Sequence, residues 1–226
     1  AGHSLGEYSA LVAAGAIALA DAVPLVRFRA QAMQEAVPVG SGAMMAILGL
    51  DGADVQRACE QAARDSGEVV AAANFNDPKQ TVIAGSQAGV DMAVALLKQV
   101  GAKRAMPLAV SAPFHCALMK PAADRLKERL ATTPIATPAI PVLNNIDVAL
   151  ETEPDRIRDA LYRQAFGPVR WVEVIGAMQA RGLNPILECG PGRVLSKMVK
   201  RIVHEGVAST TVLDPASLVE AKAMIQ

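Results

Sequence analysis

The chain has 226 residues, of which 52% are hydrophobic and 19% are charged, a composition that can bury a sizeable core. Lys and Arg together number 22, as do Asp and Glu, so there is no net charge to attract nucleic acid or an anionic membrane surface. No apolar run reaches the length that spans a bilayer. We expect a soluble globular protein, a monomer, that binds neither nucleic acid nor membrane.

The opening stretch AGHSLGEYSA contains the pattern Gly-x-Ser-x-Gly with Ser4 at its centre. In α/β enzymes this pattern marks a sharp turn from a strand into a helix, which lifts a nucleophilic hydroxyl out of the backbone. Only Ala1 precedes the pattern, so we expect the strand, and with it the amino-terminal part of the domain, to be missing. The pattern also arises by chance in a chain with 17 glycines, and a strand-turn-helix context would distinguish the two interpretations.

Two helices are predicted next, because apolar residues recur at helical spacing over 4–14 and over 21–36. Asp21 is a suitable cap for the second helix. Pro24 then falls within the first turn, where a missing N–H is tolerated.

Residues 40–110 show two similar halves. The turn residues NDPK separate the two middle strands, and the resulting β-α-β-β-α-β order is typical of a ferredoxin-like subdomain. The predicted elements are a strand at GAMMAILGL, a helix over 52–65, strands at VVAAANF and QTVIAG, a helix over 87–100 and a strand at KRAMPLAV.

Beyond residue 111 the chain returns to alternating helices and strands. IPVLNNI and NPILECG are predicted strands, since they are short apolar runs bounded by Pro, Asn and Gly. Strands separated by helices favour a parallel sheet. We therefore predict an α/β fold in which a large α/β-hydrolase-like domain of residues 1–39 and 111–226 carries the ferredoxin-like subdomain of residues 40–110.

A serine hydroxyl is a weak nucleophile at neutral pH, so Ser4 needs a general base, most often a histidine. His3 would point away from its neighbour at a tight turn, and His204 lies in the charged segment KMVKRIVHEG, which is typical of a solvated helix face. His115 lies in the irregular stretch SAPFHCALMKP, and loops between rigid elements often hold catalytic groups. His115 is therefore the candidate base, with a structural role as the alternative. Cys116 beside it is expected to be buried packing, since adjacent side chains diverge.

Four stretches, GHSLGEYSALVAAGAI, LADAVPLVRFRAQAMQ, SAPFHCALMKPAA and ILECGPGRVL, together resemble the malonyl-CoA:acyl carrier protein transacylases of bacterial fatty-acid synthesis. They occur in the same order over essentially the whole chain, with the predicted subdomain between the second and the third. The same fold family includes the acyltransferase domains of polyketide synthases, which stay an alternative.

The resemblance implies that Ser4 is the nucleophile and His115 its base. A malonyl group would leave a thioester, form an ester on Ser4 and pass to the phosphopantetheine thiol of acyl carrier protein. Arg29 falls on the family's carboxylate-binding arginine, and a guanidinium can hold a carboxylate through two parallel hydrogen bonds. Ala30 stands where the family usually has glycine, a departure that leaves this assignment intact.

Three further roles are implied by the resemblance. Phe114 matches the form of its loop associated with malonyl rather than methylmalonyl selection, because a bulky ring would crowd an α-methyl group. The main-chain carbonyl near Gln164, within YRQAFGPVRW, falls where the family orients the histidine. The N–H of Leu5 falls on one donor of the oxyanion hole, whereas the other lies in an upstream Gly-Gln-Gly-Ser-Gln loop that this sequence lacks. We therefore expect the chain alone to be inactive.

The implied partners are malonyl-CoA and acyl carrier protein, and no cofactor is implied, since the carrier brings the phosphopantetheine. Such carriers are typically acidic, and Lys197, Lys200 and Arg201 share a helical face that could dock one, with a solvated face as the alternative. GPGRVLSK lacks the full phosphate-loop spacing, and the resemblance assigns it to a structural turn. No metal site is predicted, because the histidines and cysteines lack ligand spacing.

The cysteine pattern favours a reducing compartment, and we expect the protein to be cytoplasmic. Cys59, Cys116 and Cys189 are odd in number and widely spaced, unlike a disulfide framework.

Two functions outside acyl transfer to a thiol remain open. A serine hydrolase would keep Ser4 and His115 but release the acyl group to water. A non-catalytic scaffold would leave Ser4 unreactive.

Overall fold

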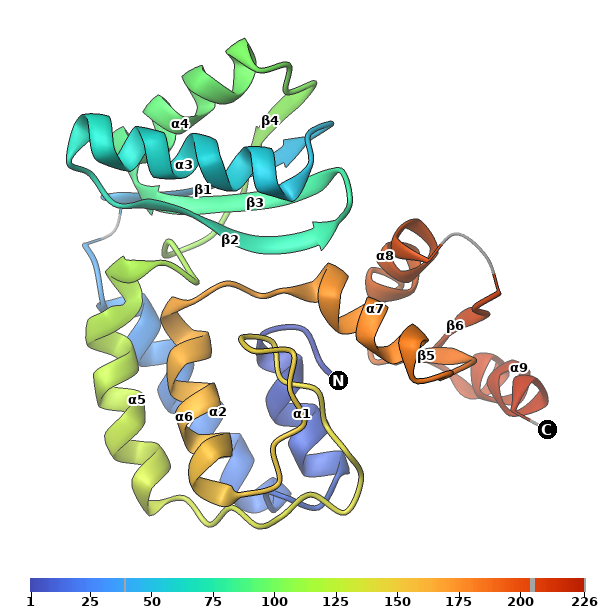
Figure 1. The fold of residues 1–226 in the computed structure, drawn as a ribbon. Helices are drawn as coiled ribbons and strands as arrows, with labels where there is room; N and C mark the ends of the chain where they lie inside the picture. The colour runs from blue at the N-terminus through green and yellow to red at the C-terminus, as the bar shows by residue number, and fades with distance from the viewer. Residues whose placement is uncertain (39, 204–205, 226) are drawn as a thin grey trace. The chain divides into compact units, whose positions relative to one another are not determined.

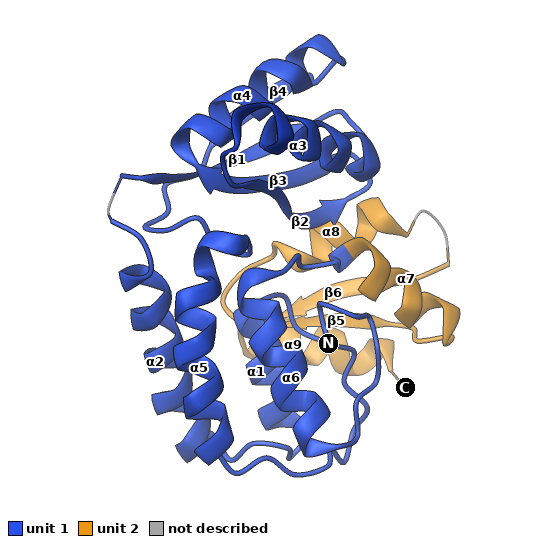
Figure 2. Ribbon diagram, turned by 60° about the vertical axis from the view of Figure 1, so that its left-hand side comes forward, with its two compact units in different colours: residues 1–171 blue, residues 172–226 orange. Residues whose placement is uncertain are grey.

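The computed structural model describes residues 1–38, 40–203 and 206–225. Contacts within the chain divide it into two compact units, residues 1–171 and residues 172–226 (Figure 2). Both units contain helices and strands, as the predicted α/β class requires.

This division follows compactness alone and crosses the predicted large domain. The predicted boundaries, residues 1–39 with 111–226 and residues 40–110, therefore stay a prediction.

The first unit contains a layer of four helices (Figure 1). Helices α1 (Leu5–Ala13) and α2 (Leu19–Glu35) come from the start of the chain. Helices α5 (Lys120–Thr132) and α6 (Pro154–Phe166) come from after the sheet, and the short 3-10 helix η1 (Ala117–Met119) leads into α5. Both predicted amino-terminal helices are confirmed within two residues at their ends.

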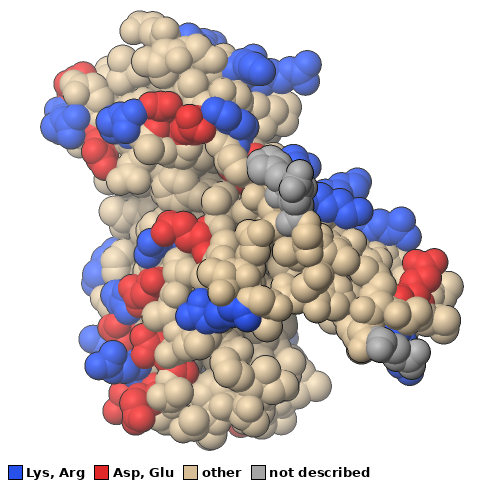
Figure 3. Space-filling model, turned by 45° about the vertical axis from the view of Figure 1, so that its right-hand side comes forward, with Lys and Arg blue, Asp and Glu red and all other residues tan. Residues whose placement is uncertain are grey.

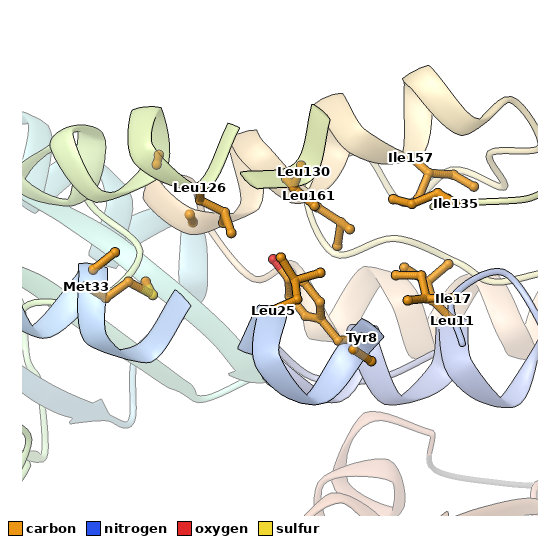
Figure 4. Packing of buried hydrophobic residues seen from close by; sticks show 14 of the residues in the cluster. Tyr8, Leu11, Ile17, Leu25, Met33, Leu126, Leu130, Ile135, Ile157 and Leu161 are labelled. Carbon is orange, nitrogen blue, oxygen red and sulfur yellow. The ribbon is translucent and has the colours of Figure 1, made fainter. Parts of the chain in front are cut away.

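The apolar faces of these helices share one core (Figure 4). Each helix contributes residues spaced three or four apart, which is the spacing that places side chains on one helical face. The largest side chains of this core include Tyr8, Leu11, Leu25, Met33, Leu126, Leu130, Ile157 and Leu161.

The start of α2 differs from the prediction. The helix begins at Leu19 with Ala18 at the N-cap, so Asp21 is not the cap and lies in the first turn, where a negative charge stabilises the helix dipole. Pro24 lies inside the helix, beyond its first turn, on the exposed side. The missing N–H of Pro24 leaves only the carbonyl of Ala20 without its helical donor, and solvent can supply one there.

The second layer of the first unit is a four-stranded sheet with strand order β2-β3-β1-β4. All neighbouring pairs are antiparallel; Ala46 of β1, for example, lies opposite Val82 of β3 and Met106 of β4. The elements are β1 (Gly42–Leu48), α3 (Gly52–Ser66), β2 (Val70–Asp77), β3 (Gln80–Ser86), α4 (Gln87–Gln99) and β4 (Arg104–Pro107).

The two faces of the sheet bury different partners because successive strand residues point to opposite sides. Ile47 and Ile83 face α3 and α4, which lie together on one side of the sheet (Figure 1). Met44 and Ala46 face the other way and pack with Cys116 and the ring of Phe114. The loop that carries His115 is thereby fixed against the open face of the sheet.

The predicted strand IPVLNNI, residues 140–146, is wrong. Its only ladder contact in the described part of the chain is an isolated bridge between Leu143 and Leu150. Asn144 and Asn145 are buried and use their side chains to bond the backbone, which competes with strand pairing.

The second unit contains a parallel pair of strands. β5 (Ile186–Cys189) confirms the predicted strand NPILECG and pairs with β6 (Ser209–Val212) in parallel, with α8 (Leu195–Ile202) between them in sequence. Helix α7 (Trp171–Ala180) starts at the boundary with the first unit, and α9 (Pro215–Met224) ends the second unit. Among the described residues, the predicted parallel sheet is represented by this pair alone.

The turn before α1 needs a glycine at residue 2 because two stretches of backbone pass very close. A Cβ atom on Gly2 would lie 1.9 Å from the carbonyl oxygen of Gly6. A Cβ on Gly6 itself would meet no heavy atom within 4 Å. The N–H of Gly6 donates to the carbonyl of His3 at 2.9 Å, which closes the turn.

We expect Gly2→Ala to destabilise the full-length protein by about 1–3 kcal/mol, because the backbone must move to admit the methyl group. Gly6→Ala is the matched control, and it should leave stability unchanged or raise it by up to about 1 kcal/mol through helix propensity. Denaturant unfolding midpoints of the two variants would check this. Equal midpoints would contradict the close approach at Gly2.

Candidate active site

Ser4 stands where the turn meets α1, and its backbone is unusual. Its φ of 51° and ψ of −108° lie outside the regions that residues with side chains prefer. The N–H of Ser4 donates to Oδ1 of Asn145 at 2.7 Å, a bond that holds this conformation. Strained backbone held by its surroundings is characteristic of functional sites.

The structure brings His115 against Ser4. Nε2 of His115 lies 2.7 Å from Oγ of Ser4, and Nδ1 lies 2.9 Å from the main-chain oxygen of Gln164. A carbonyl oxygen can only accept, so Nδ1 carries the hydrogen and Nε2 of the neutral ring presents its lone pair to the Ser4 hydroxyl. This is the arrangement that a general base needs.

Burial favours the neutral form of this histidine. The His115 side chain is 4% exposed, and desolvation together with the nearby Arg29 guanidinium lowers its pKa from 6.5 to about 3. The ring is therefore unprotonated at neutral pH and free to accept the Ser4 proton.

The neighbouring thiol takes no part in this pair. Cys116 is buried and its Sγ donates to the carbonyl oxygen of Pro113 at 3.0 Å. The prediction that Cys116 serves packing is confirmed.

Arg29 brings a buried positive charge to the same hydroxyl. Its side chain is 7% exposed, and Nη2 donates to Oγ of Ser4 at 3.2 Å and to Oε1 of Gln164 at 3.3 Å. Its guanidinium also lies over the ring of Tyr8, 5.5 Å from the centroid. Nε of Arg29 has no hydrogen-bond partner within the described residues. A buried cation with spare donor capacity is suited to bind an anion.

These groups line a pocket of about 290 Å³. Polar and apolar residues both line the pocket: the polar ones are His3, Ser4, Arg29, Asn74 and His115, and the apolar ones are Met44, Leu108, Val110 and Phe114.

The remaining predicted residues lie around this pocket in different ways. Gln164 is fully buried. Its main-chain oxygen contacts His115, and its side chain donates to the main-chain oxygen of Ser4. Phe114 is half-buried and forms part of the pocket wall. Leu5 has an exposed side chain, but it is the first residue of α1, where an N–H has no acceptor within the helix. The catalytic and binding roles of all six predicted residues stay predictions.

The sequence analysis missed two buried residues that hold the site, Glu7 and Asn145. Oε2 of Glu7 accepts from the N–H of Asn145 at 2.8 Å and from Nε2 of Gln164 at 2.9 Å. A signal for Glu7 was available, because it lies one turn before Leu11 and therefore on the apolar face of the helix. The signal for Asn145 was a polar residue within an apolar run.

His3 points away from the Ser4 hydroxyl, as expected. Its Nε2 lies 2.9 Å from Oδ1 of Asn76, and its ring meets Trp171 edge to face. Burial lowers the pKa of His3. His204, the third candidate, lies outside the described residues.

In the second unit, the helix that starts within GPGRVLSK has its first N–H groups bonded by Glu188 of β5. The carboxylate of Glu188 accepts from the N–H groups of Val194, Leu195 and Ser196 at 3.1, 3.0 and 2.8 Å. A negative charge already occupies this amino terminus, so a phosphate group would be repelled.

The predicted basic face lies on α8. Lys197, Lys200 and Arg201 are all exposed. Figure 3 shows Lys and Arg side chains along one edge of the second unit.

The described part of the chain contains neither a membrane-spanning helix nor a cluster of metal ligands. None of its helices is long and apolar enough to cross a lipid bilayer. No group of three or more His, Cys, Asp or Glu side chains is arranged to hold a metal ion.

Comparison with known proteins gives relatives with one recurring name. Malonyl CoA-acyl carrier protein transacylase of Escherichia coli K12 is 56% identical over 209 residues, which are 92% of this chain and 67% of that protein. The protein of the same name from Bacillus subtilis is 47% identical over 218 residues, 96% of this chain and 68% of that protein.

The solved structures to which this chain is similar include proteins of the same kind. The acyl-carrier-protein S-malonyltransferase of Burkholderia pseudomallei 1710b superposes with a TM-score of 0.93 at 57% identity, covering 97% of this chain and 70% of that one. A malonyl-transacylase in complex with its type II PKS acyl-carrier protein superposes with a TM-score of 0.93 at 50% identity, with the same coverage of 97% and 70%.

The acyl transferase domain family matches residues 1–218, a range that holds Ser4, Arg29, His115 and Gln164. The match extends over both compact units and is not confined to the serine turn. This chain belongs to the acyl transferase domain family.

Proposed function

We propose that this chain transfers a malonyl group from malonyl-CoA to the phosphopantetheine thiol of acyl carrier protein, through a malonyl ester on Ser4. The observation that carries the proposal is the chain of contacts from Ser4 Oγ through His115 to the Gln164 carbonyl, at 2.7 and 2.9 Å, beside the buried Arg29. The names of the relatives support malonyl-CoA and acyl carrier protein as the two substrates.

In the first half-reaction, Oγ of Ser4 attacks the thioester carbonyl of malonyl-CoA while Nε2 of His115 takes the hydroxyl proton. The tetrahedral intermediate then collapses, the carbon–sulfur bond breaks, and His115 returns the proton to the departing CoA thiolate. Ser4 is left carrying the malonyl group as an ester, and His115 is neutral again.

The second half-reaction runs the same steps with the carrier. His115 takes the proton of the phosphopantetheine thiol, and the sulfur attacks the Ser4 ester. Collapse of this intermediate forms malonyl-carrier and gives the proton back to Oγ of Ser4. One histidine therefore serves both halves.

The negative charge that develops on the carbonyl oxygen needs hydrogen-bond donors. The N–H of Leu5, at the amino terminus of α1, is the proposed donor from this chain, since helix starts present N–H groups and a positive dipole end. Such a donor commonly contributes about 10²–10³ in rate.

Arg29 is the proposed partner of the malonyl carboxylate. Its guanidinium lines the pocket next to Ser4, and its positive charge would stabilise an anionic acyl group in this buried setting. Phe114, which lines the same pocket, would crowd an α-methyl group. That selection is modest, because one methyl group in a pocket is worth about 1–3 kcal/mol.

A polyketide-type carrier is a second candidate acceptor, favoured by one observation. One of the solved relatives is a malonyl-transacylase bound to a type II PKS acyl-carrier protein. A serine hydrolase would use the same Ser4 and His115 but has no need of the charge of Arg29.

The acidic carrier could dock on the exposed α8 face formed by Lys197, Lys200 and Arg201, by electrostatic steering. The reaction needs no cofactor resident on this chain, since CoA and phosphopantetheine arrive with the substrates. Monomeric state and a cytoplasmic location are part of the same proposal, the latter because the three described cysteines are free thiols.

We also propose which fold types the two predicted domains adopt. Residues 40–110 form a ferredoxin-like subdomain, since the β-α-β-β-α-β order and two helices on one face of an antiparallel sheet are characteristic of that fold. The remaining elements belong to a hydrolase-like domain, because a Gly-x-Ser-x-Gly turn leads directly into α1.

We expect brief mixing of the full-length protein with malonyl-CoA to give a malonyl adduct in intact-protein mass spectra. Ser4→Ala should form none, and acyl carrier protein should discharge the adduct. Acetyl-CoA and methylmalonyl-CoA run beside it test the acyl preference. A folded protein without any adduct would rule out Ser4 as the nucleophile.

Replacement of Arg29 should separate malonyl from acetyl substrates. Arg29→Ala is expected to slow acylation by malonyl-CoA by about 10²-fold, and acylation by acetyl-CoA much less, because only malonate carries the carboxylate. Arg29→Lys should restore only part of the rate, since an ammonium lacks the planar fork. Arg27→Ala, on the exposed side of the same helix, is the control. Equal losses for both substrates would contradict carboxylate binding.

The lowered pKa of His115 can be measured by NMR titration. Because its pKa is about 3 rather than 6.5, the imidazole should stay neutral as the pH falls from about 8 to about 5. The resonance is assigned by its loss in His115→Gln. A midpoint near the ordinary histidine value would show that burial does not hold the base neutral.

A further inference from the structure

Glu7 is a buried acid that the proposed reaction does not use. It lies on α1, three residues after Ser4, and its side chain is only 2% exposed. Burial raises its pKa to about 7. Acidic side chains are seldom fully buried unless their oxygens have partners, so its contacts are informative.

Two buried donors meet at one oxygen of this side chain. Oε2 accepts from Nε2 of Gln164 at 2.9 Å and from the N–H of Asn145 at 2.8 Å. Glu7 therefore joins α1 to two segments that are more than a hundred residues away in sequence.

The first of these partners, Gln164, contacts Ser4, Arg29 and His115. Nε2 of Gln164 also donates to the main-chain oxygen of Ser4 at 3.0 Å, and its Oε1 accepts from Nη2 of Arg29 at 3.3 Å. Its main-chain oxygen accepts from Nδ1 of His115. A rotation of the Gln164 amide would break the contacts to Ser4 and Arg29 together.

The second partner, Asn145, holds the serine turn through its side chain. Oδ1 of Asn145 accepts from the N–H of Ser4, and Nδ2 donates to the main-chain oxygen of Gly2 at 2.8 Å. The carboxylate of Glu7 thus fixes the backbone at Asn145. The side chain of Asn145 in turn bonds the backbone of the serine turn at Gly2 and Ser4.

We propose that Glu7 is a positioning residue for acyl transfer: by accepting from Gln164 and Asn145 it holds the Gln164 amide against Arg29 and the strained Ser4. This inference rests on the proposed malonyl transfer. What the site requires at residue 7 is an oxygen that accepts two hydrogen bonds, which a glutamine amide supplies as well as a carboxyl group does.

The test compares two substitutions of similar size in the full-length protein. Glu7→Gln keeps the acceptor oxygen and should keep the rate at which saturating malonyl-CoA acylates Ser4. Glu7→Leu removes the acceptor and should lower that rate by about 10²-fold, the usual effect of a small misplacement of reacting groups. The loss should appear in kcat with little change in KM.

Leu11→Ala is the matched control for stability. Leu11 lies one turn further along the same face of α1, is 3% exposed and does not line the pocket. Its truncation should lower the melting temperature and leave the acylation rate unchanged. Equal acylation rates in Glu7→Leu and the unchanged protein would overturn the proposal, as would a Glu7→Gln variant that is as slow as Glu7→Leu.

If Glu7→Leu fails to fold, Gln164→Met tests the same bond from its other end. It removes the donor but keeps the main-chain oxygen that orients His115, and it should slow acylation about as much. An unchanged rate in folded Gln164→Met would overturn the proposal. The unchanged protein is measured in every run: if it forms no malonyl adduct, the proposed function fails, whatever the variants do.

Discussion

The hydrogen bond from Nδ1 of His115 to the main-chain oxygen of Gln164 sets the chemistry of this site. Because a carbonyl carries no full negative charge, it fixes the tautomer and raises the pKa of His115 less than burial and Arg29 lower it. A carboxylate in its place would raise the pKa of the histidine, whereas here burial and Arg29 both lower it. A buried cation can therefore lie beside the base, and the same cation is available for an anionic acyl group.

Two residues of the candidate site, Ser4 and His115, adopt positive φ angles of 51° and 62°. Such conformations cost free energy and persist only where the surroundings determine them. The helical core beneath α1, the packing of the His115 loop on the open face of the sheet and the bonds from Asn145 supply that constraint. The fold thus places a hydroxyl, a base and a cation from distant segments within hydrogen-bond reach.

Local patterns predicted much of this from the sequence. Helical periodicity gave both amino-terminal helices, and turn residues gave the order of elements over residues 40–110. The pairing of Ser4 with His115 followed from the need for a base and the elimination of the other histidines. Glu7 and Asn145 could not be placed, because their roles depend on contacts between segments remote in sequence. The strand prediction for residues 140–146 was wrong for the same reason. The side chain of Asn145 bonds the serine turn, and that of Asn144 accepts from the N–H of Asp147, so this segment does not pair within a sheet.

The central claim is that acyl transfer passes through a covalent ester on Ser4. Isotope exchange tests it most directly: full-length protein is mixed with malonyl-CoA and labelled free CoA, without any carrier. An ester intermediate predicts that label enters malonyl-CoA, because CoA can reverse the first half-reaction, and that Ser4→Ala abolishes the exchange. Absence of exchange in a protein that still malonylates the carrier would mean direct transfer between the two thiols and would contradict the account.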